Sequence, residues 1–221
     1  YEIHERLVGS EMCIRDRYGG DIAVGAMTIL TSIMQFAMLP LQGIAQGAQP
    51  ITSYNYGAGN ADRVSKTFRL LLTVCLSYSF LLWGCIMLFP AVFAKIFTSD
   101  AELVAFTAKA LRIYCAVLFI FGIQIACQMT FVSIGNAVCS ISVAVLRKFV
   151  LLLPLIYILP HVIADQTMAV YTAEPCADII AVSCTGILFA SRFRKALKKL
   201  REKNACLLYT SPSPRDAHES R

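Results

Sequence analysis

The sequence predicts an all-α integral membrane protein with about five transmembrane helices. Of the 221 residues, 57% are hydrophobic and 15% are charged, whereas about 25% of the residues in a soluble domain are charged. Several uncharged stretches exceed the roughly 20 residues that a helix needs to cross a hydrocarbon core of about 30 Å. Basic residues gather beside these stretches, as they do at the cytoplasmic ends of transmembrane helices.

Both ends of the chain differ in composition from the rest. EIHERLVGSEMCIRDR near the start and CLLYTSPSPRDAHESR at the end look like translated sequencing-adapter read-through, and native charged tails are the alternative. We therefore treat residues 1–17 and 204–221 as artefactual flanks and expect one transmembrane bundle over residues 18–203.

The first predicted span covers residues 22–49. It follows Asp21, and no charged residue occurs again before Asp62. Glycines, prolines and glutamines crowd the stretch LPLQGIAQGAQPITSYNYGAGN, which we expect to form a polar elbow at the end of the span. Polar groups at membrane depth are kept where they face protein or water, so this stretch either lines a path or packs helices together.

Three side chains of this segment are candidates for a transport pathway. Gln35 and Gln46 are eleven residues apart, about three helical turns, so they share a face that we expect to line a lumen. Tyr54 is a candidate wall for an apolar cargo, although aromatic side chains at span ends serve more often as interfacial anchors.

The second and third spans follow from the next two uncharged stretches. Residues 70–94 form the second predicted span, after a basic turn. The mixed-charge segment 95–109 is expected to be a connector, in which Ser99 and Glu102 have the spacing of a capping box. The uncharged stretch that follows is too long for one span and contains Gly135 and Asn136, so we end the third span there, at 113–134, with Gln124 inside it.

The fourth predicted span, 140–159, ends at Pro160 and carries two basic residues in its first half, Arg147 and Lys148. Arg147 either snorkels toward a basic membrane surface or points inward as a cation within the bundle. We favour snorkelling.

The fifth predicted span, 167–190, contains Glu174 and Asp178, the two acidic residues that fall inside a span. Their four-residue spacing places both carboxylates on one helical face, and Pro175 between them frees a backbone carbonyl for an ion or water. Two like charges in a low dielectric do not both ionise readily, so one is expected to hold a proton. The alternatives are a solvated Glu174 near the outer surface and a structural hydrogen bond between Asp178 and a neighbouring helix.

The distribution of positive charge predicts the topology. The basic turn at 62–69 and the basic tail at 192–203 are both expected on the cytoplasmic side, because positive charge gathers there. Four predicted crossings separate them, an even number, so both lie on the same side of the membrane. The tail is also able to contact anionic lipid. This places the C-terminus in the cytoplasm and starts the first span outside, which implies a further helix upstream.

Enzymatic chemistry finds no support in the sequence. No nucleophile triad, metal cluster or phosphate-binding loop is apparent, and apart from the two in the flanks, the cysteines lie in apolar segments where they act as small buried hydrophobes. We expect no cofactor and no nucleic-acid partner, because hydrophobic spans flank the basic segments.

The chain resembles the C-terminal half of a multidrug and toxic compound extrusion (MATE) transporter. The resemblance is carried by an ordered set of motifs, GGDIAVGAMTI at 19–29, GIAQGAQPITSYNYGAGNADRV at 43–64, ALRIY at 110–114, SIGNA at 133–137, LRKFVLLLPLIYILP at 146–160 and AEPCAD at 173–178. It implies one lobe of a two-lobe, twelve-helix transporter, with the spans here being the eighth to the twelfth.

That resemblance also implies a function. Cation-coupled antiport, driven by H⁺ or Na⁺, would export amphipathic, mostly cationic drugs by alternating access between two lobes, in a bacterial cell membrane. Many members of the family carry a carboxylate in the seventh or tenth span, whereas here the seventh span is absent and the tenth offers only Gln124 and Gln128.

Two other functions remain open. A lipid-linked oligosaccharide flippase has a related architecture, but its lumen needs several cations to meet a diphosphate, and here only Arg147 and Lys148 qualify. A structural or signalling membrane subunit that moves nothing would need neither Glu174 nor Asp178.

Overall fold

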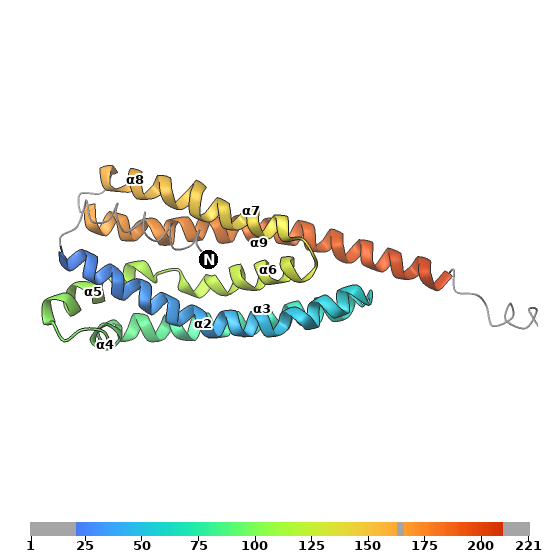
Figure 1. Ribbon diagram of the computed structural model, residues 1–221, viewed down its shortest axis with the longest axis horizontal. Coiled ribbons are helices and arrows are strands. Elements are labelled where there is room, and N and C mark those ends of the chain that lie inside the picture. Colours follow the sequence, from blue (N-terminus) through green and yellow to red (C-terminus); the bar gives the residue numbers. More distant parts are fainter. Residues whose placement is uncertain (1–20, 163–165, 210–221) are drawn as a thin grey trace, which may run out of the picture.

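The computed structural model describes residues 21–162 and 166–209, and every element within these ranges is helical. The helices lie side by side along the long axis of the molecule (Figure 1). By length and composition, four are able to cross a membrane, and a bent helix pair makes a fifth candidate. The predicted all-α membrane fold is confirmed. The predicted flank 1–17 lies outside the described residues, and so do residues 210–221 of the second predicted flank.

Helix α2 (Asp21–Gly57) is longer than the predicted span 22–49 and runs through Pro40 and Pro50. The predicted polar elbow is wrong, because most of it forms the last turns of this helix. Each proline removes only one backbone hydrogen bond, and buried side chains along the helix hold it in place. The chain turns instead at Gly59, whose φ of 81° favours glycine.

Helix α3 (Ala61–Leu88) starts earlier than the predicted span 70–94, so the basic segment at its start is helical. It ends before Phe89, which has φ −126° and ψ 50°, and Pro90 opens the short helix α4 (Pro90–Lys95). A proline disfavours the helical conformation in the residue before it, which explains the break.

The third pass through the bundle consists of two helices that meet at a 46° bend. These are α5 (Ala101–Tyr114) and, after the 3₁₀ turn η1 (Leu118–Ile120), α6 (Phe121–Ser133). Much of the predicted connector 95–109 is therefore helix. Its N-cap is Asp100, which accepts a hydrogen bond from the N–H of Glu102 at 2.9 Å, so the prediction of a capping box beginning at Ser99 was wrong by one residue.

The fourth pass begins after Gly135 (φ 77°), where the sequence predicted a break. It joins α7 (Ala137–Val145), a π-helical segment η2 (Leu146–Leu152) and α8 (Leu153–Val162). Pro160 lies inside α8 and does not end it.

Helix α9 (Gln166–Tyr209) forms the fifth pass and extends well past the predicted end at residue 190, beyond the rest of the bundle (Figure 1). The basic tail is thus the continuation of the last transmembrane helix. Phe193 and Leu200 are buried within it, and this apolar stripe keeps the segment helical.

The core lies between α2, α3, α5 and α6, where Leu30, Leu41, Ile86 and Leu111 are fully buried. A second apolar cluster joins η2 and α8 to α9. Helices α3 and α6 approach closely at Gly122, which has no side chain. A Cβ at this position would lie 2.7 Å from the backbone oxygen of Cys75.

One end of the bundle gathers both basic segments. The guanidinium of Arg201 in α9 lies 2.7 Å from the carboxylate of Asp62 in α3, and the amide of Asn204 donates to the carbonyl of Gly59 at 2.6 Å. Phe68 packs against the stacked rings of Phe189 and Phe193 at the same end. The two basic segments lie together, as the predicted topology requires; the side of the membrane that they face stays a prediction.

Candidate functional site

Two acidic side chains of the last transmembrane helix are buried within the bundle. Glu174 and Asp178 lie one turn apart on α9 and are 5% and 2% exposed. Small residues surround them on the same helix, where Ala173 and Ala177 are buried against η2 and α8. These alanines let the neighbouring helix approach α9 closely enough for a side chain to bridge the gap.

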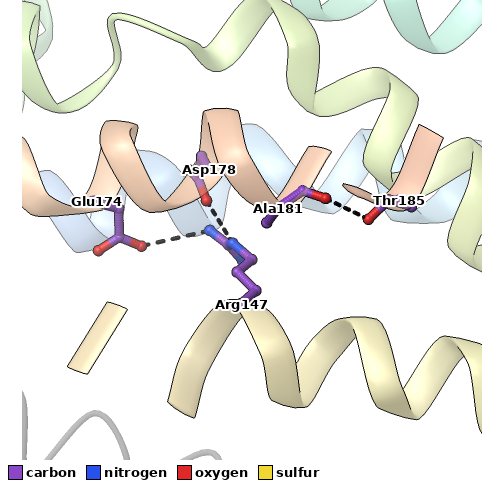
Figure 2. Close-up of polar contacts among 5 residues, drawn as sticks. All are labelled: Arg147, Glu174, Asp178, Ala181 and Thr185. Carbon is purple, nitrogen blue, oxygen red and sulfur yellow. Dashed lines mark hydrogen bonds and ion pairs between the residues drawn. The ribbon is translucent and has the colours of Figure 1, made fainter. Parts of the chain in front are cut away.

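Arg147 from η2 bridges that gap. Its Nε donates a hydrogen bond to Oδ1 of Asp178 at 2.5 Å, and its Nη2 lies 3.6 Å from Oε1 of Glu174 (Figure 2). The arginine side chain is 19% exposed. The interpretation that Arg147 snorkels to the membrane surface is wrong, because two buried carboxylates on the facing helix draw its guanidinium inward.

The backbone around Arg147 is unusual. The N–H of Leu153 donates to the carbonyl of Lys148, five residues earlier, which is the spacing of a π-helix. Such turns are rare and occur frequently at functional sites. The segment η2 packs directly on α9, so the arginine and the two carboxylates meet at the contact between two passes.

A third element completes the cluster. The ring of Phe121, the first residue of α6, lies with its centroid 4.7 Å from Cζ of Arg147. A cation over an aromatic face gains about 0.5–2 kcal/mol, more when it is shielded from water. The guanidinium is therefore held by two carboxylates and one aromatic ring, contributed by α9 and α6. We call Arg147, Glu174, Asp178 and Phe121 the ion cluster.

Arg147 compensates only part of the negative charge of the pair. With both carboxylates ionised, the three charged groups carry a net charge of −1. Removing one partner from a buried ion pair costs about 3–5 kcal/mol, because it leaves a charge without compensation in a low dielectric. Asp178 accepts a hydrogen bond from a neighbouring helix, and this does not exclude its predicted role in ion coupling. Glu174 is buried, so it is not the solvated surface residue of the alternative interpretation.

Gln124 lies one turn beyond Phe121 on α6 and is 3% exposed. Within the described residues, its Oε1 atom has no hydrogen-bond partner. A buried carbonyl oxygen of this kind costs free energy unless something satisfies it, so Gln124 stays a candidate polar group near the ion cluster.

The remaining predicted pathway residues lie elsewhere. Gln35, Gln46 and Tyr54 are all exposed on α2, with Tyr54 at 76%. The spacing of the two glutamines does place them on one face, as predicted, but this face is separate from the buried ion cluster.

Sequence reasoning missed one residue of the ion cluster, Phe121, and one nearby residue of α9, Tyr171. Tyr171 lies three residues before Glu174, so the same helical spacing would have placed it on the acidic face. Its hydroxyl donates to the carbonyl of Ala23 at 2.8 Å and ties α9 to α2. Phe121 had no comparable signal, because its contact with Arg147 joins two distant segments.

A separate cavity of about 570 Å³ opens between α4 and α5. Lys95, Thr98, Ser99 and Val104 line part of it. None of the predicted pathway residues lies among its lining residues, so it adds nothing to the ion cluster.

The family model and the solved structures that match the chain agree on one family. The MatE family model matches residues 12–158. The structure resembles the MATE multidrug transporter DinF-BH in complex with R6G, at 33% identity and a TM-score of 0.71, over 82% of this chain and 40% of that one. No curated protein sequence matches the chain.

Two further solved structures share the fold. An outward-facing multidrug resistance MATE family transporter of the MOP superfamily is 20% identical with a TM-score of 0.81, over 88% of this chain and 44% of that one. Its inward-facing counterpart is 20% identical with a TM-score of 0.75, over 86% and 43%. The chain spans less than half the length of each of these transporters.

Proposed function

Because the chain belongs to the multidrug and toxic compound extrusion (MATE) family, we propose that it forms the C-terminal lobe of a drug exporter. The exporter moves amphipathic, mostly cationic drugs out of the cell, in exchange for H⁺ or Na⁺, by alternating access between this lobe and an N-terminal lobe. Members of this family are transporters and not enzymes.

The observation that carries this proposal is the buried ion cluster. A structural membrane helix has no need of two carboxylates and a guanidinium in its interior, since each is costly to remove from water. Ionisable groups inside a bundle are typical of ion and proton pathways. Asp178 is the residue to which we assign ion coupling, with Glu174 beside it.

The related transporter in complex with R6G supports a drug-like cargo. The face of α2 that exposes Gln35 and Gln46, together with the exposed Tyr54 nearer the end of the helix, supports a second contribution. We propose that it borders the cavity between the lobes, where neutral hydrogen-bonding and aromatic groups suit varied amphipathic molecules.

The proposed orientation places the C-terminus in the cytoplasm of a bacterial cell. It rests on the basic residues of α3 and α9 that meet at one end of the bundle, because cytoplasmic ends of spans are rich in Lys and Arg.

A flippase for lipid-linked oligosaccharides is less well supported. Its cargo carries a diphosphate and needs cations that are available to bind it. Arg147 already contacts two carboxylates, and the net negative charge of the three groups repels a phosphate.

The test is ethidium efflux from cells that express the full-length gene recovered from the source DNA. We expect Asp178→Asn to abolish efflux while expression in the membrane is retained. The matched control is Glu202→Gln on the same helix, whose exposed carboxylate pairs with Lys198 at 3.8 Å and whose loss should leave efflux unchanged. Efflux that survives Asp178→Asn would contradict the assignment of ion coupling to Asp178, and no efflux from the intact protein would contradict the proposed function.

A further inference from the structure

The carboxylate pair of the ion cluster already holds a cation. Oδ1 of Asp178 and Oε1 of Glu174 both face the guanidinium of Arg147, at 2.5 and 3.6 Å (Figure 2). The arginine belongs to the chain itself, so its local concentration at the carboxylates is very high and does not depend on the surrounding solution.

We infer that Arg147 determines ion selectivity in this lobe, as a tethered cation that excludes Na⁺ from Glu174 and Asp178. The inference rests on the proposed function and narrows it: the pair is open to protons and closed to metal cations while Arg147 is in place.

The geometry of the carboxylate pair disfavours a bound metal cation. Hard metal cations need several oxygen ligands around one point. The guanidinium already contacts one oxygen of Glu174 and one of Asp178, the oxygens through which an ion would bind both carboxylates (Figure 2). The ring of Phe121 lies against the same guanidinium and offers no oxygen.

Electrostatic repulsion by Arg147 also disfavours a metal cation at the pair. An ion bound to the outer oxygens of the pair would lie on carboxylates that the guanidinium already contacts. Two like unit charges about 4 Å apart at an intermediate dielectric reduce affinity by up to roughly a thousandfold. Lys148 adds a second positive charge to the field at Asp178.

The other groups around the cluster do not offset this repulsion. Tyr114 from α5 lies within electrostatic range of Arg147, and Cys115 lies within range of Glu174. Neither is an anion at neutral pH in its ordinary state. The other acidic residues whose side chains are described are outside the bundle interior, at Asp62, Asp100, Glu102 and Glu202.

A proton escapes both restrictions. It adds to a single carboxylate oxygen as an O–H bond and needs no shell of ligands. One proton takes the three charged groups from a net charge of −1 to zero, with Arg147 still bound to the remaining carboxylate.

The experiment is equilibrium binding of ²²Na⁺ to the purified full-length transporter at neutral pH. We expect the single variant Asp178→Asn to bind Na⁺ as the wild type does, because the carboxylate pair of the wild type binds no Na⁺. Arg147→Gln should create a Na⁺ site at least about tenfold tighter than any wild-type binding at this pair, and Asp178→Asn in the Arg147→Gln background should remove it. Arg147→Lys keeps the positive charge and should bind Na⁺ as the wild type does.

Chemical rescue separates selectivity from a merely structural role. In Arg147→Ala, millimolar guanidinium ion should compete with ²²Na⁺, because it fits between two carboxylates and an aromatic ring. The same concentration should have no effect on the wild type, whose own guanidinium fills the site.

Two results would overturn the inference. One is Na⁺ binding to the wild type that Asp178→Asn abolishes, which would show that the pair accepts Na⁺ beside Arg147. The other is a folded Arg147→Gln protein, judged by its gel-filtration profile, that gains no Na⁺ site. If Arg147→Gln does not fold, the wild-type comparison still decides. An unmodified transporter that shows no efflux would contradict the proposed function. The Na⁺-binding results would still test the inference about Arg147.

Discussion

Removing the positive charge of Arg147 should destabilise the protein strongly, and removing all three charges of the ion cluster should not. The side chains of Arg147, Glu174 and Asp178 are 19%, 7% and 3% exposed, so solvent screens them little. Breaking such a pair costs about 3–5 kcal/mol. For a domain of this size, each kcal/mol shifts the Tm by about 2–4 °C, so Arg147→Gln should lower the Tm by roughly 6–20 °C.

The comparison variant replaces Arg147, Glu174 and Asp178 together by Gln, Gln and Asn. It leaves neutral polar groups of similar size, and replacing a whole buried ion pair is often close to neutral. We therefore expect the triple variant to be more stable than Arg147→Gln by at least about 2 kcal/mol, which double-mutant logic attributes to coupling among the charges.

A thiol-reactive fluorescent dye follows the unfolding. Cys75, Cys115 and Cys127 are free and buried, so they react as the bundle opens, while the exposed Cys85 and Cys184 supply a constant background. Equal destabilisation by the single and the triple variant would refute the electrostatic reasoning, because it would show that packing alone determines the loss.

Two further predictions concern the turns. Gly59→Ala should cost about 1–2 kcal/mol for a side chain at positive φ, and its Cβ, 2.3 Å from Oδ1 of Asn204, would displace that side-chain amide; the dye assay measures the loss. Gly57→Ala is the control, since a Cβ there meets nothing within 4 Å, and an equal loss in both variants would contradict the conformational argument. Asp100→Ala should cost about 1 kcal/mol by removing the N-cap of α5, whereas Ser99→Ala should be close to neutral in the same assay. A larger loss from Ser99→Ala would return the cap to the residue that the sequence predicted.

The limits of the helices show where local sequence rules failed. The uncharged segments predicted the passes well, because hydrocarbon tolerates few charges. The predicted spans ended too early in α2 and α9 and began too late in α3. A helix continues through polar or basic residues when one stripe of it stays buried, as Phe193 and Leu200 are in α9, and the partner that buries this stripe is not visible in the local sequence.

The acidic residues and their basic partner were predictable to different degrees. Glu174 and Asp178 were identified as a pair from a spacing of four, which any helix turns into a shared face. The direction of Arg147 was assigned wrongly. A long basic side chain at this depth is able to reach either the surface or the interior, and only the position of η2 against α9 decides between them.

The sequence by itself determined the membrane class, the approximate passes and the face on which the two carboxylates lie, because these follow from the cost of charge in hydrocarbon and from the periodicity of a helix. The tertiary structure alone decided that Arg147 from η2 and Phe121 from α6 meet those carboxylates. Contacts between distant segments depend on how whole helices pack, and that packing is set by the sum of many small interactions and not by any one motif.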